Sequence, residues 1–337
     1  MARRGGWRRV GSPGRLRYLD SRGRTIADEA QIERVDALRI PPAWKDVWIS
    51  PNPRAKLQAT GIDAAGRRQY LYHPEYRAQQ EQAKYDKLVR FAERLPAIRA
   101  AMAEHMELEP TDAERVCAVA VRLMNLAWFR VGSDRHARRS RTYGVTTLSR
   151  RHVSIRGTRV SFRFPAKNRT MVRTTLVDAE LAEAMKALSE TPGARVFRYK
   201  RDGEFCNLTG AVLNDYIGEH MGDGFTAKDF RTWGGTLTAA IMLAERGVAE
   251  TEAEAKRAVA AVMQRVGDRL GNTPAVARAS YVSPAVVEHY LEGRTITDFR
   301  PRHLRVVGAR DIELDPEEQA LLSLLRSWRI RRARMAA

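Results

Sequence analysis

The sequence predicts an α+β protein in which a small, mostly β amino-terminal domain precedes a larger, mainly α-helical domain. Three observations lead to this fold class. The chain has 337 residues, and one domain usually takes about 100–200 residues. Short strand-like runs bounded by turn residues fill residues 1–80. Helical patterns dominate residues 81–337, which open with a linking helix over residues 80–95 and include one three-stranded sheet.

The elements of the amino-terminal domain follow from its turn residues and helix breakers. The first 24 residues hold eight Arg and one Asp, which predicts a flexible basic arm running into a hairpin around the turn at 20–23. A short helix is expected over 30–38, because Pro41 and Pro42 cannot continue it. β-branched and aromatic residues predict the remaining strands, at residues 46–49, 56–60 and 68–72.

The larger domain is predicted to be helical except for one sheet. Residues 76–95 lack Gly and Pro and are rich in good helix formers. A capping box at 111–114 predicts a second helix that begins at Thr111. Residues 152–177 predict three strands with Lys167 at a turn. The other helices are expected over residues 178–189, 209–221, 229–247, 250–267, 284–293 and 315–333.

The charge of the chain predicts the kind of partner it binds. Lys and Arg number 59 and Asp and Glu 40, so the formal net charge is 59 − 40 = +19. An excess of this size indicates a polyanion, with nucleic acid favoured over an anionic membrane. No apolar run approaches the roughly 18 residues of a membrane helix, and no apolar segment of a secretory signal follows the basic amino terminus. We therefore expect a cytoplasmic protein.

Several classes of chemistry lack their usual motif. The sequence contains no GxxxxGK[ST] loop for ATP, no GxGxxG dinucleotide fingerprint and no HExxH among its seven His. Cys117 and Cys206 form no CxxC pair, so neither a disulfide framework nor a zinc site is expected. The expectation is a protein that requires no cofactor and no metal.

Five polar residues on ordinary elements are candidates for chemistry. Arg130 closes an apolar helix, Lys167 occupies a turn, Arg231 lies near the start of a helix, and Asn272 precedes Tyr281 by nine positions. Each has an ordinary structural role when taken alone: a helix-end charge, a solvated turn residue, a turn former or a half-buried aromatic. Only the set as a whole favours function.

The set belongs to a series of motifs that resembles the type IB DNA topoisomerases, specifically the short poxvirus and bacterial branch. The order and spacing of the motifs carry the resemblance, which covers nearly the whole chain. They are Ile40-Pro41-Pro42-Ala43-Trp44, Gln58-Ala59-Thr60-Gly61-Ile62-Asp63, Gly66-Arg67-Arg68-Gln69-Tyr70, Arg130-Val131-Gly132, Tyr143-Gly144-Val145-Thr146-Thr147-Leu148, Lys228-Asp229-Phe230-Arg231-Thr232 and Gly271-Asn272-Thr273-Pro274.

The resemblance implies an enzyme that relaxes supercoiled duplex DNA by cutting one strand, letting it swivel and resealing it. Tyr281 would be the nucleophile, forming a 3′-phosphotyrosyl link and releasing a 5′-hydroxyl. Arg130, Arg231 and Asn272 would hold the non-bridging phosphate oxygens, and Lys167 would protonate the departing oxygen. Many relatives have His where this chain has Asn272. An amide can donate a hydrogen bond but cannot serve as an acid or base, so Asn272 is expected to be a donor only.

The same resemblance implies how DNA is held. The two domains would close around double-stranded DNA as a clamp, formed by a monomer on the bacterial nucleoid. Candidate DNA-binding residues are Arg67, Gln69, Tyr70, Tyr72, Gly132, Arg135 and Lys228. Strand alternation places Tyr70 and Tyr72 on one face and Gln69 on the other, and a buried core position is an equal alternative for either tyrosine.

Two other classes of protein remain as alternatives. A tyrosine recombinase shares the Tyr chemistry and the Arg-Lys-Arg set, but that family usually has His three residues before its second Arg, where this chain has Lys228. It also tends to begin with a helical domain rather than strands. A non-catalytic, basic DNA-binding protein would account for the charge, but it does not predict the combination of Arg130, Lys167, Arg231 and Tyr281.

Overall fold

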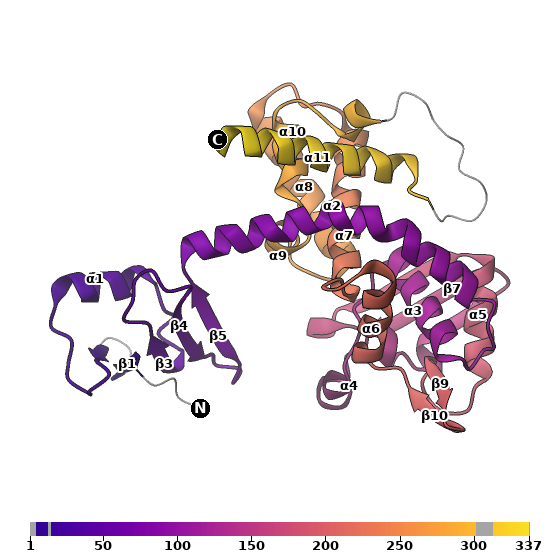
Figure 1. Ribbon diagram of the computed structural model, residues 1–337, viewed down its shortest axis with the longest axis horizontal. Coiled ribbons are helices and arrows are strands. Elements are labelled where there is room, and N and C mark those ends of the chain that lie inside the picture. Colours follow the sequence, from indigo (N-terminus) through magenta and orange to yellow (C-terminus); the bar gives the residue numbers. More distant parts are fainter. Residues whose placement is uncertain (1–4, 13–14, 301–312, 337) are drawn as a thin grey trace. The chain divides into compact units, whose positions relative to one another are not determined.

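The computed structural model describes residues 5–12, 15–300 and 313–336, and the chain divides into two compact units, Met1–Tyr85 and Asp86–Ala337 (Figure 1). The predicted boundary at residue 80 lies inside a long helix, α2 (Pro74–His105), which continues from one unit into the next. The predicted α+β class, with a small β unit followed by a larger helical unit, is confirmed. Within the described residues no helix is both long and apolar enough to cross a membrane.

The first unit is one antiparallel sheet with the strand order β2-β1-β3-β4-β5. One helix, α1 (Glu29–Ala37), packs on it through Val35, and the small core also contains Trp7 and Ile49. The predicted helix and the three later strands are confirmed within two residues. The strands are β1 (Trp7–Val10), β2 (Arg17–Leu19), β3 (Lys45–Ile49), β4 (Leu57–Ile62) and β5 (Arg68–Tyr72).

The predicted flexible arm is wrong for the part of it that the structure describes. Trp7 to Val10 form β1 inside the sheet, and Trp7 is only 8% exposed. The Arg9 guanidinium donates to the carbonyl oxygens of Ile40 at 3.1 Å and Trp44 at 2.7 Å, which fixes the segment before β3. Burial of an aromatic side chain therefore overrides the basic composition. Arg3 and Arg4 lie outside the described residues.

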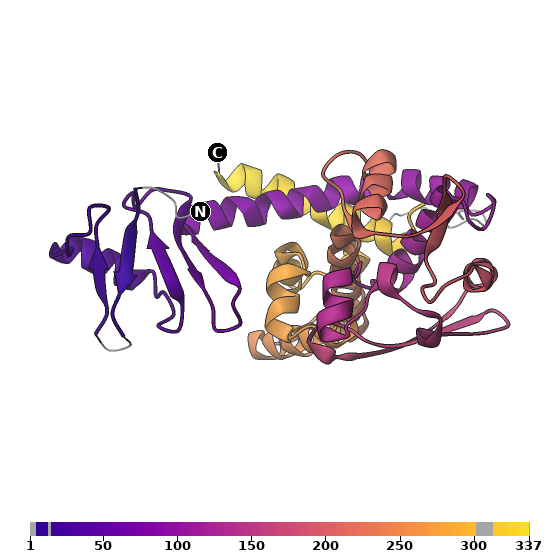
Figure 2. The ribbon, with the colours of Figure 1, turned by 90° about the horizontal axis from the view of Figure 1, so that it is seen from below.

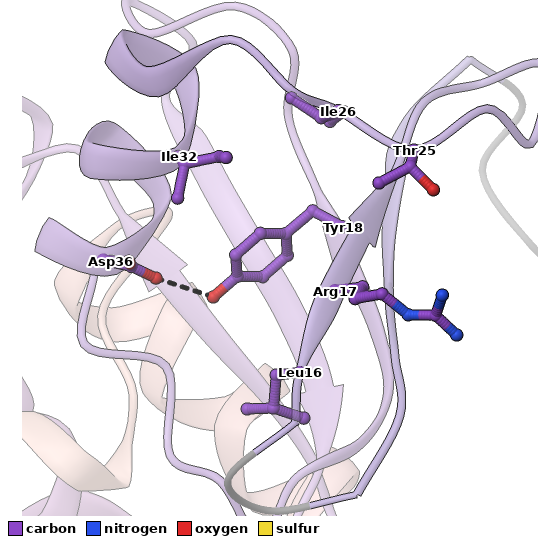
Figure 3. A pocket seen from close by; sticks show the side chains of 7 residues that line it. All are labelled: Leu16, Arg17, Tyr18, Thr25, Ile26, Ile32 and Asp36. Carbon is purple, nitrogen blue, oxygen red and sulfur yellow. Dashed lines mark hydrogen bonds between the residues drawn. The ribbon is translucent and has the colours of Figure 1, made fainter.

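The predicted hairpin around residues 20–23 is reduced to a single bridge, between Leu19 and Thr25, because β2 forms its ladder with β1. A shallow pocket lies between this strand and α1 (Figure 3). There the Tyr18 hydroxyl donates to Asp36 at 2.8 Å. Burial, followed by this bond, raises the pKa of Tyr18 to about 12. The bond connects the edge strand to the helix, so the polar groups of the pocket serve the fold of this unit.

The second unit is mainly helical (Figures 1 and 2). Its centre is α3 (Ala113–Ala127), which packs against α5, α6 and α7 and buries eight residues, six of them the consecutive run 116–121, so the helix is buried on all sides. Besides α2 and α3, its longer helices are α5 (Ala179–Glu190), α6 (Gly210–Met221), α7 (Ala227–Arg246), α8 (Glu252–Leu270), α10 (Pro284–Leu291) and α11 (Pro316–Ala336).

The three-stranded sheet predicted in this unit is confirmed. It consists of β6 (Val153–Arg156), β7 (Arg159–Pro165) and β8 (Met171–Val177) in antiparallel order. Val160, Phe162 and Phe164 of β7 are buried against the helical core. A one-turn 3-10 helix, η3 (Lys167–Arg169), joins β7 to β8 and carries the candidate lysine.

Helix ends agree with the capping predictions with one correction. The cap of α3 is Asp112 rather than Thr111, because the Asp112 carboxylate accepts from the amide of Glu114 at 2.7 Å. Asp315 caps α11 as expected, accepting from the amide of Glu318 at 2.7 Å. Three short features were not predicted: α4 (Asp134–Ser140), α9 (Pro274–Ser280) and the hairpin of β9 (Arg198–Arg201) and β10 (Glu204–Asn207). Each is too short to show a hydrophobic period.

The Arg-rich carboxy-terminal helix packs against other helices of the second unit. α11 runs alongside the later part of α2 (Figures 1 and 2), where Arg326 pairs with Glu93 at 2.7 Å. Arg99 of α2 forms two hydrogen bonds to the buried Glu318 carboxylate, and Trp233 of α7 donates to the same group at 3.2 Å. The Glu318 carboxylate of α11 therefore binds both α2 and α7 and holds these three helices together.

Candidate active site

Four of the five candidate residues converge in the second unit. Arg130 follows α3, Arg231 lies on the second turn of α7, Asn272 lies between α8 and α9, and Tyr281 follows α9. One Arg130 Nη donates to Asn272 Oδ1 at 2.8 Å, and the Arg231 guanidinium carbon lies 5.1 Å from the centre of the Tyr281 ring. The first of these contacts joins residues 142 positions apart in the chain.

Arg130 lies beyond the helix that it was predicted to close. α3 ends at Ala127, and Trp128 adopts a left-handed conformation with φ 52°, which turns the chain out of the helix. The Arg130 side chain then reaches the loop after α8, where it also donates to the carbonyl oxygen of Gly271 at 3.0 Å. Burial lowers the pKa of Arg130, but an arginine keeps its charge at neutral pH. The position of the Arg130 side chain is set by one backbone carbonyl and one side-chain amide oxygen, and the sequence does not reveal either contact.

Arg231 is a buried cation, 5% exposed. It donates to the carbonyl oxygens of Trp128 and of Leu270, the latter at 2.7 Å. Its Nε has no hydrogen-bond partner among the described residues. Burial, followed by repulsion from Arg130, lowers its pKa to about 10, so it remains protonated at neutral pH. A buried charge whose donors are only partly used is unfavourable unless an anion joins it.

Tyr281 is a half-buried side chain on a fixed backbone. The Thr236 hydroxyl of α7 shares its one hydrogen between the carbonyl oxygens of Thr232 at 2.8 Å and Tyr281 at 3.1 Å, and it accepts from the amide of Ser283 at 3.1 Å. A Cβ on Gly235 would lie 2.8 Å from the same carbonyl oxygen, so only glycine allows α7 to approach this closely. The sequence did not single out Thr236 or this role of Gly235.

The surroundings of Tyr281 favour its ionised form. Burial raises the pKa of the phenol, but the charge of Arg231, a hydrogen bond with the Arg231 side chain and the charges of Arg130 and Lys228 lower it. Their combined effect is larger, so the net shift is downward. The sequence offered no base for this residue. Neighbouring cations assist deprotonation without one, because they stabilise the phenolate.

The Asn272 side chain contacts Arg130 through its amide oxygen. Its Oδ1 accepts from Arg130, and its Nδ2 donates weakly to the carbonyl oxygen of Leu270 at 3.3 Å. Each NH₂ group has two hydrogens, so one remains for a further acceptor. The amide can therefore orient Arg130 and still donate to an anion.

We expect Asn272→Ala to lose more DNA cleavage rate than Asn272→His. The alanine variant removes both the acceptor for Arg130 and the donor, whereas imidazole can replace a single donor. Loss of one oriented donor is worth roughly 10²–10³-fold in rate. Single-turnover cleavage of a radiolabelled duplex at saturating enzyme measures both variants. An Asn272→His protein that folds but shows no cleavage contradicts the donor account.

Lys167 lies on an exposed turn beside this cluster. Two residues of the turn, Asn168 and Arg169, have positive φ values of 62° and 59°. The turn reaches the loop after α8, since a Cβ on Gly271 would lie 4.0 Å from Thr170 Cγ2 and 3.3 Å from Arg130 Nη1. The Lys167 carbonyl oxygen accepts from the amide of Thr170 at 3.4 Å, but its ammonium group forms no hydrogen bond or ion pair with any residue that the structure describes.

The candidate DNA-binding residues of the first unit fall into two groups. Tyr70 and Tyr72 are 48% and 42% exposed and stack with ring centres 6.3 Å apart, so the core alternative for them is wrong. Gln69 points to the other side of β5, where it donates to Asp63 at 2.7 Å. Arg67 also bonds Asp63, at 2.8 Å, and these bonds lower the pKa of Asp63 to about 2.

The candidates of the second unit are exposed except for Gly132. Its φ of 100° requires glycine, and a Cβ there would lie 2.7 Å from Thr147 Oγ1, so packing of the chain already accounts for this residue. Arg135 is exposed on α4, which also exposes Arg138 and Arg139. Lys228 is exposed on the first turn of α7, close enough to Tyr281 to lower its pKa.

Trp128 contacts Arg231 and Arg269 and was not among the residues predicted from the sequence. Its carbonyl oxygen accepts from Arg231, and its ring lies between Gly234 and the guanidinium of Arg269, whose carbon is 4.3 Å from the ring centre. A Cβ on Gly234 would lie 2.2 Å from the ring. The Gly234-Gly235 pair could have indicated a close contact here. Glycine destabilises the interior of a helix, so two glycines in a row suggest that another group packs closely against this part of α7.

We expect Gly234→Ala to displace Trp128 and with it the acceptor of Arg231. Overpacking costs about 1–3 kcal/mol, so urea unfolding is expected to show a lower stability together with slower DNA cleavage. Gly218→Ala on α6 is the matched control, because a Cβ there meets nothing within 4 Å. This control is expected to gain up to about 1 kcal/mol and to cleave normally. Equal stability and activity in both variants would contradict the clash.

Comparison with known proteins covers both units. The family model of the eukaryotic DNA topoisomerase I catalytic core matches residues 73–295, and that of the bacterial DNA topoisomerase IB N-terminal domain matches residues 15–63. DNA topoisomerase 1B of Acanthamoeba polyphaga mimivirus is 30% identical over 77% of this chain and 80% of its own length. DNA topoisomerase I of monkeypox virus and DNA topoisomerase 1B of vaccinia virus (strain Copenhagen) are 21% and 20% identical, over 77% of this chain and 82% of each relative.

Proposed function

Because this chain belongs to the type IB DNA topoisomerases, with DNA as its substrate, we propose that it relaxes supercoils through a covalent tyrosyl intermediate and without ATP. The resemblance seen in the motifs is thereby confirmed at the level of the family. The roles of individual residues are our proposal. The observation that carries it is the fixed positive charge of the buried Arg231 guanidinium beside the Tyr281 ring.

The proposed reaction is an exchange of one phosphodiester for another. The Tyr281 oxygen attacks the phosphorus, the bond to the 5′ oxygen breaks, and Lys167 protonates that oxygen. The phenol proton is lost to water, which the surrounding cations favour. Arg130 and Arg231 face the charge on the non-bridging oxygens of the transition state, where a preorganised donor is worth about 3–4 kcal/mol. Arginine suits this task because its planar fork can bond two oxygens.

The proposed independence of ATP follows from the energy of the reaction, and the proposed independence of metals follows from the charge of the site. The phosphotyrosyl link is itself a phosphodiester, so breaking the DNA strand conserves the bond energy. The 5′-hydroxyl then attacks the same phosphorus and restores the strand, with Tyr281 leaving. Between the two steps the free end swivels and releases supercoils. Two fixed guanidinium groups supply the positive charge that a metal ion supplies in other phosphoryl-transfer sites.

We propose further that a single copy of the chain holds the duplex with residues from both units. The exposed stack of Tyr70 and Tyr72 offers aromatic and hydroxyl contacts to a DNA groove. Arg135 and Lys228 are free for phosphates on the second unit, whereas Arg67 and Gln69 must share their donors with Asp63. Action on nucleoid DNA in the cytoplasm fits the charge of +19.

Plasmid relaxation tests the proposed function. Purified protein incubated with supercoiled plasmid in EDTA and without ATP is expected to give a ladder of topoisomers that ends at the relaxed circle. Adding Mg²⁺ or ATP is not expected to change the final distribution of topoisomers. A requirement for either contradicts the proposed chemistry. Exchange between two plasmid sites would indicate a recombinase instead, and binding without any change in linking number would indicate a non-catalytic DNA-binding protein.

A further inference from the structure

The outward face of the β6-β7-β8 sheet is unusually basic. Val160, Phe162 and Phe164 point into the core, so the alternate positions of β7 and their partners on the neighbouring strands point to solvent. These outward positions contain four Arg and three hydroxyl residues and no acid. We call them the arginine face: Ser154, Arg156, Arg159, Ser161, Arg163, Pro165, Met171, Arg173, Thr175 and Val177.

The four arginines stand in two directly opposed pairs. Arg156 is the register partner of Arg159, and Arg163 is the register partner of Arg173. Like charges opposite one another destabilise a sheet. None of the four guanidinium groups forms an ion pair or a hydrogen bond with another described residue, although their backbones belong to the ladder of the sheet. Between the pairs, Ser161 and Thr175 share a hydrogen bond of 2.9 Å. Stability of the sheet therefore does not explain this arrangement, and an anionic partner does.

The spacing of the positive charges matches a phosphate backbone. Arg159, Arg163 and Lys167 follow one another at intervals of four residues along β7 and its turn, which is about 13 Å per interval. Base pairs of duplex DNA are stacked about 3.4 Å apart, so one interval corresponds to roughly four base pairs. Arginine and hydroxyl side chains are common phosphate ligands in DNA complexes. Because β7 leads directly into the turn that carries Lys167, the duplex that is being cleaved is the favoured partner of the arginine face.

We propose that the arginine face binds the phosphate backbone of the cleaved duplex. The bound DNA lies on the side of the cleavage site toward which the β6-β7-β8 sheet extends from the Lys167 turn. The pair Arg163 and Arg173 contacts DNA roughly four base pairs from the cleavage site. The pair Arg156 and Arg159 contacts it roughly four base pairs farther out. This inference rests on the proposed role of Lys167, and it assigns a direction to the DNA that the active site alone does not give.

The test measures DNA affinity in a Tyr281→Phe background, so that no chemistry intervenes. The near pair is changed as Arg163→Gln/Arg173→Gln and the far pair as Arg156→Gln/Arg159→Gln. Arg246→Gln/Arg257→Gln is the matched control, because both residues are exposed at the far ends of α7 and α8 from the cluster. On a long duplex each lost contact is expected to weaken binding roughly eightfold at 0.1 M salt and to reduce the salt slope by about 0.9.

Trimming the duplex from each end in turn identifies the contact. Trimming one end only is expected to abolish the far-pair effect, once that end lies within about eight base pairs of the cleavage site. The near-pair effect is expected to vanish at about four base pairs. Losses no larger than those of the control overturn the proposal. Losses that ignore duplex length, or that need a second duplex added in trans, assign the face to other DNA and also overturn it.

Thermal melting and plasmid relaxation complete the test. The glutamine variants are expected to melt at or above the temperature of the parent protein, because each removes a like-charge pair. A lower melting temperature would show that the arginines serve the sheet and would overturn the proposal. Plasmid relaxation by the unmodified chain is scored separately. If relaxation fails while the length-dependent binding holds, the proposed function fails and the DNA contact stands.

Discussion

We expect the Tyr281→Phe variant to lose relaxation and covalent adduct formation together, by at least about 10⁴-fold, as removal of a nucleophile does in other enzymes. The substitution removes one oxygen and leaves the ring against Arg231. DNA affinity is therefore expected to change little. The measurement traps protein on radiolabelled DNA with denaturant and counts the adduct after electrophoresis.

Tyr290→Phe is the matched control for this result. Tyr290 lies on the next helix, is 3% exposed and donates to the carbonyl oxygen of Gly247 at 3.0 Å. Its loss is expected to cost about 0.5–1.5 kcal/mol of stability and to leave the adduct intact. Equal adduct yields from Tyr281→Phe and the unmodified protein would refute the assignment of the nucleophile.

We expect Arg231→Ala to slow cleavage of bound DNA by roughly 10²–10³-fold or more. In the proposed reaction the guanidinium faces the charge on the phosphate, and it also lowers the pKa of Tyr281, so its loss is expected to weaken both transition-state stabilisation and activation of the nucleophile. Because it is one cation among 59 Lys and Arg, DNA affinity is expected to fall much less. Single-turnover cleavage at saturating enzyme, together with equilibrium binding, separates the two quantities.

The conservative variant Arg231→Lys distinguishes charge from geometry. Lysine keeps the positive charge but cannot bond Trp128, Leu270 and a phosphate oxygen at once with a planar fork. We expect it to recover only part of the lost rate. Thermal unfolding of both variants shows whether the fold persists without the two carbonyl contacts. A large loss of affinity with an unchanged cleavage rate would contradict the catalytic role.

Local patterns account for what could be predicted of the fold. The helix α1, the later strands of the first sheet and the β6-β7-β8 sheet follow from turn residues, breakers and side-chain alternation, all of which act within a few residues. Prediction failed for Trp7 to Val10, where burial of Trp7 in the sheet core outweighs a basic composition. It also missed α4 and α9, seven residues each, which are too short for a period to appear.

For the active site, the motifs predicted the candidate residues, but they did not predict the contacts between them. Arg130 was assigned to a helix end, yet it extends from a turn made by Trp128 in a left-handed conformation. Asn272 stays predicted as a donor to phosphate through its NH₂ group, and the contact of its oxygen with Arg130 was not predicted. Trp128, Thr236 and the clearance at Gly234 and Gly235 carry no motif of their own, because their roles depend on elements that lie close only after folding.

The class of fold, the excess of positive charge and the identity of the family follow from the amino-acid sequence, because composition, periodicity and motif order are properties of the chain. Which atoms meet follows only from the folded structure. It placed Arg231 under Tyr281, saturated part of each guanidinium with backbone carbonyls and exposed the stacked Tyr70 and Tyr72. The physical reason is that local propensities act over a few residues, whereas desolvation, charge coupling and glycine clearance arise between segments that packing brings together.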